Sequence, residues 1–110
     1  MNYKLLTIPS FDKQFKRLAK KYPSLKNEIR QLGEELSINP KQGVDLGKNC
    51  YKIRLAIESK GKGKSGGGRV ITHVYVEAET VYMLSIYDKS EQSDISENEI
   101  LKLLERIKLD

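Results

Sequence analysis

Basic side chains are concentrated between Lys48 and Arg69. This stretch contains seven Lys or Arg residues and a single acid, Glu58, so its local charge of +6 exceeds the +5 of the whole sequence. Lys and Arg bind phosphate and carboxylate groups through charge-assisted hydrogen bonds. With an isoelectric point near 9.3, the cluster predicts an anionic partner: nucleic acid, an acidic protein or an anionic membrane surface.

Three of these cations are predicted to lie on strands. Residues 50–58 alternate apolar and polar side chains, which places Lys52 and Arg54 on one face of a strand. Arg69 opens the next apolar run, and alternation puts His73 on the face of Arg69, so both are expected to border one cleft. A simpler interpretation stays open, in which Lys52 and Arg54 form an ordinary solvent-exposed face and His73 is a packed strand residue.

Such cations suit RNA cleavage. The 2′-hydroxyl of RNA is itself the nucleophile, so the reaction needs neither a metal nor a covalent enzyme residue. Arg and Lys can orient the backbone and stabilise the charge of the transition state. A Lys crowded by other cations can also transfer protons, because its charged form is disfavoured. Lys52, Arg54 and Arg69 are therefore candidate catalytic residues.

The glycine-rich loop Lys60–Gly68 does not fit a nucleotide-binding motif. A P-loop would need its first glycine at Glu58, and a strand rather than a helix follows the loop. One histidine and one cysteine also exclude a Cys/His metal cage and an internal disulfide. We expect no metal and no cofactor. The loop lysines are interpreted as mobile contacts to an RNA backbone: Lys60, Lys62 and Lys64.

The remaining sequence predicts one α+β domain over residues 1–110, in the order β-α-α-β-β-β-α. An antiparallel three-stranded meander is packed by an N-terminal helix pair and followed by a C-terminal helix. Ser10 is expected to cap the first helix, and Pro23 to lie in the first turn of the second. The predicted elements are a strand at 2–8, helices from Ser10 and Pro23, a loop at 41–48, strands at 50–58, 69–77 and 81–87, and a helix from Ser96.

The C-terminal helix has a clear start signal. Ser96 and Glu99 form a capping box, with Ile95 and Ile100 at the positions of a hydrophobic staple. The region from Glu77 to Glu99 contains seven acids and one base, a local charge of −6. Some of these acids are expected to offset the basic strand or the helix dipole. No apolar run has the length of a membrane span, and the N-terminus lacks a signal-peptide core, which predicts a cytoplasmic protein without membrane contact.

The order of elements and three segments together resemble the RelE/ParE toxin superfamily, in particular its RelE- or HigB-like branch of type II toxin–antitoxin systems. The segments are Tyr51–Leu55, Lys60–Arg69 and Tyr87–Glu91. The resemblance implies a RelE-like fold and a ribosome-dependent mRNA endonuclease, an mRNA interferase that cuts in the ribosomal A site and arrests translation and growth. It also implies a cognate antitoxin protein as partner, with DNA contacted only through the antitoxin complex.

The same resemblance assigns the site. Its active-site pattern falls on four catalytic residues: Lys52, Arg54, Arg69 and Lys89. We predict RNA-binding roles for six further residues: Lys48, Lys60, Lys62, Lys64, His73 and Tyr87. The general base and acid are not assigned by the sequence. Two other functions stay open, a ParE-like inhibitor of DNA gyrase and a non-catalytic basic module that binds RNA or the ribosome.

Overall fold

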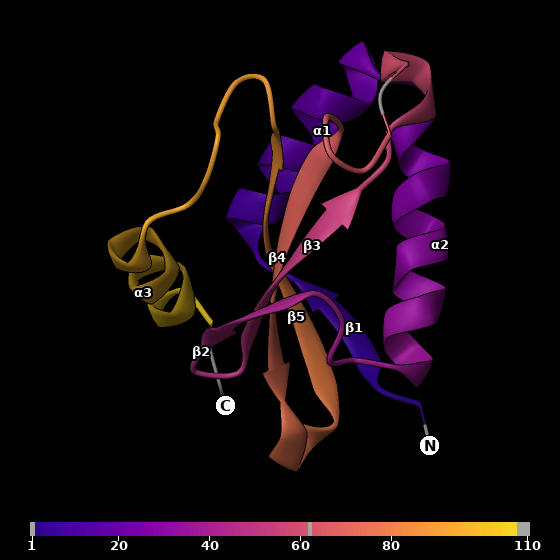
Figure 1. Ribbon diagram of the computed structural model, residues 1–110. Coiled ribbons are helices and arrows are strands. Elements are labelled where there is room, and N and C mark those ends of the chain that lie inside the picture. The colour runs from indigo at the N-terminus through magenta and orange to yellow at the C-terminus, as the bar shows by residue number, and fades with distance from the viewer. Residues whose placement is uncertain (1, 62, 108–110) are drawn as a thin grey trace.

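The computed structural model describes residues 2–61 and 63–107, which form a five-stranded mixed sheet with three helices. The strand order is β1-β5-β4-β3-β2. Figure 1 shows α2 and α3 on opposite sides of the sheet, with α1 beside the end of β5. The elements are β1 (Lys4–Thr7), α1 (Pro9–Lys21), α2 (Leu25–Ile38), β2 (Val44–Gly47), β3 (Cys50–Leu55), β4 (Gly68–Tyr75), β5 (Thr80–Asp88) and α3 (Glu97–Glu105).

The predicted α+β class and the antiparallel meander are confirmed. β3 pairs with β4, and β4 with β5, in antiparallel register. Alternation in β3 is as predicted, because Tyr51, Ile53 and Leu55 are buried whereas Arg54 is exposed. The sheet extends beyond the meander on both sides. β1 adds to β5 in parallel, which joins the first strand of the chain to the last.

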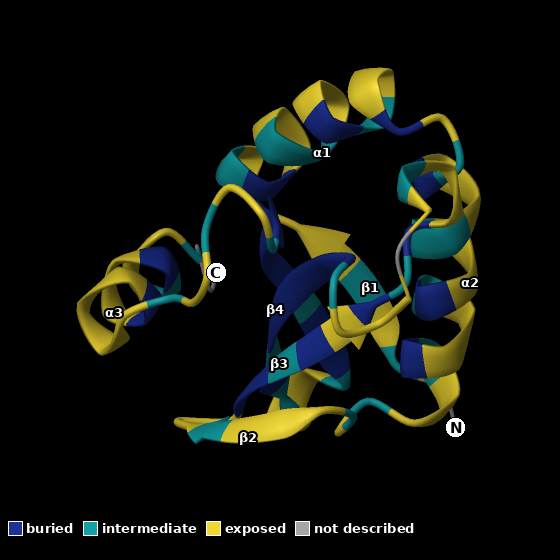
Figure 2. Ribbon diagram, turned by 45° about the horizontal axis from the view of Figure 1, so that its top comes forward, coloured by how far each residue is buried: buried dark blue, intermediate teal, exposed yellow. Residues whose placement is uncertain are grey.

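The expected loop at 41–48 is wrong in part, because it contains the edge strand β2. β2 pairs antiparallel with β3 and turns into it through Lys48 and Asn49. Both turn residues have positive φ, 54° and 58°, the backbone of a type I′ hairpin turn. Figure 2 shows β2 largely exposed beside the buried β3 and β4. A short, exposed edge strand has no buried alternation, so the sequence carried little signal for it.

Two predicted helix starts are also corrected. Pro9 occupies the first turn of α1 and Ile8 is its N-cap, whereas Ser10 lies inside the helix and donates to the Leu84 carbonyl at 3.4 Å. Pro with φ fixed near −65° suits the first helical position. Pro23 precedes α2, whose N-cap is Ser24. The N-cap of the first helix thus lies two residues before the expected one, and the second helix starts after Pro23 rather than including it in the first turn.

The helices bury the apolar stripes that the sequence predicts. Leu18, Leu25 and Leu36 are fully buried in the core between the helix pair and the sheet. On α3, the Ser96 hydroxyl accepts from the Glu99 amide at 3.1 Å, which confirms the N-cap. Among the described residues, no helix is both long and apolar enough to cross a membrane.

The glycine-rich loop packs its backbone against β3. A Cβ on Gly67 would lie 2.1 Å from the Leu55 carbonyl oxygen and 3.1 Å from the Ile57 amide nitrogen. Only glycine permits this approach. A Cβ on Gly63, by contrast, would meet no atom of the described residues within 4 Å. A side chain at Gly67 would therefore overlap neighbouring backbone, whereas one at Gly63 would not, although both glycines belong to the same loop.

Gly67→Ala is expected to lower the free energy of unfolding by about 1–3 kcal/mol, because the new methyl group overlaps backbone that cannot move away cheaply. Gly63→Ala is the matched control and should change it by less than about 0.5 kcal/mol. Urea-induced unfolding followed by circular dichroism measures both. Equal losses in the two variants would show that the close backbone contact is not the cause.

Candidate functional site

The strand register brings Arg54, Arg69 and Tyr87 into one row across the sheet. Arg54 is directly opposite Arg69, and Arg69 is directly opposite Tyr87. Directly opposed residues share a face. Lys52 lies in the next row, about 7 Å along β3, and Lys89 follows Tyr87 by two residues. We call these five residues the cationic face: Lys52, Arg54, Arg69, Tyr87 and Lys89.

Arg69 is buried and holds the glycine-rich loop. Its guanidinium donates to the carbonyl oxygens of Lys64 at 2.9 Å and Ser65 at 3.2 Å. It also donates to its neighbour Gly68 at 2.9 Å. Only 4% of Arg69 is exposed. In this conformation the guanidinium is occupied by loop carbonyl oxygens and is largely shielded from solvent.

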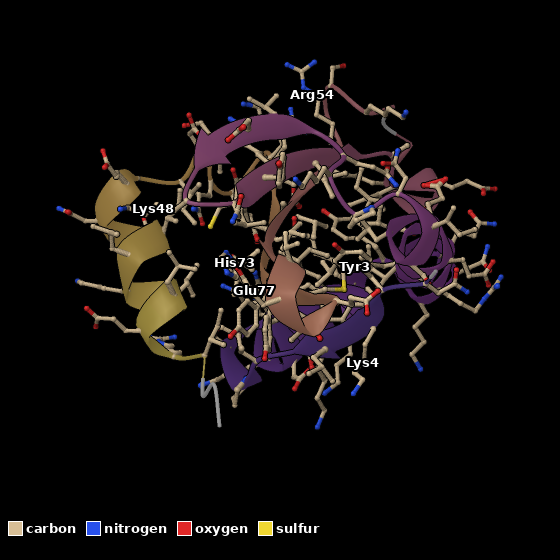
Figure 3. All side chains as sticks on the ribbon, turned by 90° about the horizontal axis from the view of Figure 1, so that it is seen from below. Tyr3, Lys4, Lys48, Arg54, His73 and Glu77 are labelled. Carbon is tan, nitrogen blue, oxygen red and sulfur yellow. The ribbon has the colours of Figure 1, made fainter. Side chains whose placement is uncertain are left out.

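Arg54 is the exposed cation of the row. Within residues 2–61 and 63–107, its guanidinium makes no hydrogen bond or ion pair. Figure 3 shows Arg54 projecting away from the body of the protein. Arg54 and Lys64 line a groove of about 420 Å³ beside α2, together with Glu28 and Glu35. An arginine without a partner is available for a bidentate bond to a phosphate.

Tyr87 lies between the cations and nearby acids. Burial raises the pKa of its phenol, the carboxylate of Asp94 raises it further, and Arg69 lowers it. The phenol is therefore protonated at neutral pH and is a hydrogen-bond donor rather than a base. Its hydroxyl is buried, and no described residue provides a hydrogen-bond partner. Such an unpaired buried donor is costly unless a ligand or water satisfies it.

Lys52 and Lys89 both contact the segment after β5. The Lys52 ammonium lies 3.1 Å from an Asp94 carboxylate oxygen, and Lys89 donates to the Ser93 carbonyl at 2.9 Å. Ion pairing with Lys52 lowers the pKa of Asp94, after the larger effect of the Ile95 amide. This confirms the expectation that an acid of this region offsets the basic strand.

Two predicted RNA-binding residues lie away from the cationic face. His73 is opposite Cys50, four residues from Arg69 along β4, or about 13 Å. Burial lowers the pKa of His73, so the imidazole is neutral at pH 7. Lys48 is exposed in the β2–β3 turn at that same end. His73 shares the face of Arg69 as expected, but the two do not border one cleft.

Lys60 differs from the expectation of a mobile contact. Its ammonium forms an ion pair with Asp88 and donates to the carbonyl of Gly66 at 2.8 Å. The side chain of Lys60 is 11% exposed and that of Asp88 is fully buried. Lys64 is exposed, and its RNA-binding role stays a prediction. Lys62 lies outside the described residues.

The Asp88 carboxylate is the centre of a buried network at the end of β5. It accepts from the Tyr22 hydroxyl at 2.6 Å and from the amide and hydroxyl of Ser90 at 2.9 and 2.7 Å. Burial disfavours the charge, but the donors outweigh it and hold the pKa of Asp88 far below its usual range. The network joins the end of α1, the loop and β5, and thereby fixes the backbone beside Arg69.

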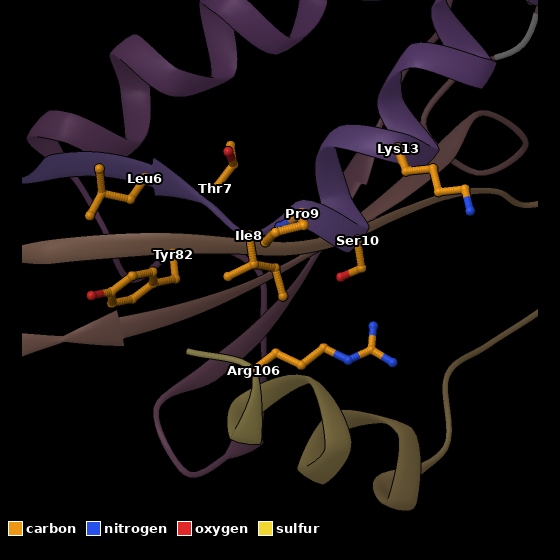
Figure 4. A pocket seen from close by; sticks show the side chains of 8 residues that line it. All are labelled: Leu6, Thr7, Ile8, Pro9, Ser10, Lys13, Tyr82 and Arg106. Atoms are coloured by element: carbon orange, nitrogen blue, oxygen red, sulfur yellow. The ribbon is translucent and has the colours of Figure 1, made fainter. Parts of the chain in front are cut away.

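A second, more apolar groove lies on a different part of the protein. Figure 4 shows it between β1, the start of α1 and the chain beyond α3, with a volume of about 720 Å³. It contains none of the predicted site residues. Its lining includes the apolar or aromatic residues Leu6, Ile8, Pro9 and Tyr82 and the basic residues Lys13 and Arg106.

Sequence reasoning missed the partners of the cations. Asp94 and Ser93 were not singled out, although the acidic composition of their region was evident. Asp88 and Ser90 match an Asx turn, which is readable from sequence. The contact of Tyr22 with Asp88 joins residues far apart in the chain and left no local signal.

Sequence and structure comparisons identify the family. A sequence model of RelE toxins of RelE/RelB toxin–antitoxin systems matches residues 11–108. The chain belongs to the RelE toxin family. It is therefore a toxin of the type II toxin–antitoxin class. Among the described residues of this RelE-family toxin, no group of three or more His, Cys, Asp or Glu side chains could hold a metal ion.

Solved structures of E. coli proteins share the fold of this RelE-family chain. A doubly substituted variant of the toxin RelE in the free state has a TM-score of 0.65 at 18% identity, covering 98% of this chain and 100% of that one. The toxin in the intact RelBE toxin–antitoxin complex has a TM-score of 0.52 at 23% identity, covering 78% and 95%. A RelE variant bound to an antitoxin RelB peptide has a TM-score of 0.52 at 22% identity, covering 100% and 99%.

Lys60→Met is expected to lower the free energy of unfolding by about 3 kcal/mol, because it leaves the buried Asp88 carboxylate without its cation. Lys64→Met removes the same charge from the same loop at an exposed position, so its effect should stay within about 0.5 kcal/mol. Urea titration provides both values. Similar values for the two variants would mean that the buried pair is not a structural anchor.

The free energy of unfolding is expected to fall as the pH drops below the ordinary Asp value of 3.8. The pKa of Asp88 is lower in the folded than in the unfolded chain, so acid protonates the unfolded chain first and favours it. Asp88→Asn should flatten this pH dependence. The measurement is urea unfolding across a pH series, and an unchanged slope in Asp88→Asn would contradict the assignment.

Proposed function

We propose that this toxin is a ribosome-dependent mRNA endonuclease that cleaves mRNA in the ribosomal A site. The observation that carries the proposal is the row Arg54–Arg69–Tyr87 with Lys52 beside it, on the sheet of a RelE-family chain. Three cations and a protonated phenol on adjacent strands suit a phosphodiester group. We further propose that the protein acts in the cytoplasm.

The cationic face supports the charge changes of RNA cleavage. The 2′-hydroxyl attacks the phosphorus, and negative charge builds up on the non-bridging oxygens. Arg54, unpaired and exposed, binds one of these oxygens, and Arg69 adds positive charge behind it. The phenol of Tyr87 would be a further donor to the same group once its buried hydroxyl is uncovered. The ammonium of Lys52 can protonate the leaving 5′-oxygen.

Cleavage also needs a group that accepts the proton of the 2′-hydroxyl, and the cationic face does not supply one in this conformation. The imidazole of His73 lies about 13 Å from Arg69 along β4, and the phenol of Tyr87 has a raised pKa. The Asp94 carboxylate is paired with Lys52. We propose that the ribosome-bound substrate provides the missing group, which would make the activity depend on the ribosome.

A cognate antitoxin is the second proposed partner. The E. coli RelE toxin of similar fold forms the RelBE complex with its antitoxin. By analogy, an antitoxin encoded beside this toxin would hold it inactive. Acidic or polar antitoxin residues over Arg54 and Lys64 would be complementary in charge to the exposed part of the site. DNA would be contacted only through that complex.

Programmed ribosomes with a defined A-site codon test the activity. The toxin is expected to cut the mRNA within that codon and to leave the same mRNA intact without ribosomes. Primer extension maps the cut. Intact mRNA on toxin-treated ribosomes would refute the proposal, and inhibition of gyrase supercoiling in a parallel assay would point to the ParE-like alternative.

Arg54→Ala is expected to lower the cleavage rate about a hundredfold, because a preorganised charge on the transition state is lost. Arg54 has no protein partner among the described residues, so the fold should be retained. Lys26→Ala removes one exposed positive charge from α2 and should retain nearly full activity. Single-turnover cleavage on ribosomes measures both rates. A fully active Arg54→Ala would place the active site elsewhere.

A further inference from the structure

We propose that the segment Asp88–Ile95 lowers the affinity of this toxin for RNA by pairing with one of its RNA-binding cations. The carboxylate of Asp94 occupies the place on Lys52 that an RNA phosphate would take, so RNA must displace it to pair with Lys52. We call residues 88–95 the acidic segment. The inference rests on the proposed RNA-cleaving function, and it adds a regulatory element that competes for the same cation.

The acidic segment is anchored firmly where it begins. Asp88 is buried within its hydrogen-bond network, as described above. Glu91 then binds the end of α1, with its carboxylate 2.9 Å from the Arg17 guanidinium and 3.8 Å from the Lys21 ammonium. The chain therefore leaves β5 along a fixed path. That path determines which part of the segment can reach the cationic face.

The far end of the segment covers two of the predicted catalytic cations. Asp94 pairs with Lys52 at 3.1 Å, and the Ser93 carbonyl accepts from Lys89 at 2.9 Å. The segment is also ordered internally, because Gln92 donates its side-chain amide to the Asp94 carbonyl at 2.9 Å. Carboxylate and carbonyl oxygens thus occupy the donors that would otherwise bind phosphate oxygens.

The start of α3 does not account for the Asp94–Lys52 pair. The helix has its own N-cap in Ser96, which accepts from the Glu99 amide. Asp94 accepts from the Ile95 amide at 2.8 Å through the same oxygen that binds Lys52. An asparagine oxygen could keep this amide bond without carrying charge. The negative charge of Asp94 is therefore separable from its local hydrogen bond.

The Asp94–Lys52 ion pair is exposed enough to be displaced by a competing anion. The side chain of Asp94 is 65% exposed, whereas that of Lys52 is 22% exposed. The carboxylate is thus the more solvent-exposed partner of the pair. Exposed ion pairs contribute little, about 0.2–1 kcal/mol. That corresponds to a factor of about 1.4 to 5 in an RNA dissociation constant, so the segment moderates binding and does not block it.

The test compares Asp94→Asn with Glu97→Gln, which makes the same charge change at an exposed position in the first turn of α3. The probe is a short fluorescent single-stranded RNA without ribosomes, measured by fluorescence anisotropy at fixed salt. Asp94→Asn should bind more tightly than Glu97→Gln, by a factor of about 1.4 to 5. In a Lys52→Met background the advantage of Asp94→Asn should disappear, because its partner is absent.

Equal affinities for Asp94→Asn and Glu97→Gln would overturn the inference, since the gain would then be a general charge effect. An advantage that survives in Lys52→Met would overturn it as well. These outcomes are independent of cleavage. Wild-type cleavage on programmed ribosomes decides the proposed function separately, so a failure of the activity and a failure of the inhibition are distinguishable.

Discussion

The buried ion pair between Lys60 and Asp88 is the interaction on which the local architecture of the site depends. A carboxylate with no solvent contact is tolerated because an ammonium, a phenol and a serine donate to it together. Lys60 also binds the carbonyl of Gly66, so one side chain ties the loop to the end of β5. The loop in turn offers two carbonyls to Arg69. The buried ion pair is thus linked through the loop to Arg69 of the cationic face.

The cationic face is a product of strand register rather than of any single motif. Arg54 and Tyr87 flank Arg69 because β3 and β5 both pair with β4 at that point. A one-residue slip of β3 would turn Arg54 toward the core and Ile53 toward solvent. The glycine at 67 opposes such a slip, since its backbone packs against Leu55 and Ile57. Register, loop and site therefore depend on one another.

Much of this arrangement could be predicted from the sequence, and the reasons for the failures are specific. Alternation in β3 placed Lys52 and Arg54 correctly, because one face of the strand is buried. β2 was missed because an exposed edge strand does not alternate between buried and exposed side chains. α1 starts at Pro9 rather than after Ser10, because the fixed φ of proline favours the first helical position more than the capping hydroxyl of Ser10 favours a later start. The hydrogen bonds and ion pairs of Lys60, Arg69 and Lys52 depend on acceptor groups in other segments of the chain. Those pairings are set by tertiary structure, which local patterns do not encode.

The parallel pairing of β1 with β5 has a consequence for synthesis of the toxin. Lys4–Thr7 pair with Thr80–Met83, so the first strand has no partner until most of the chain has been made. Contacts between such distant segments form slowly, because a long loop must close first. The nascent chain therefore cannot complete its sheet, or align β5 with Arg69, early in translation. The row of Arg54, Arg69 and Tyr87 is therefore complete only after β5 has been synthesised.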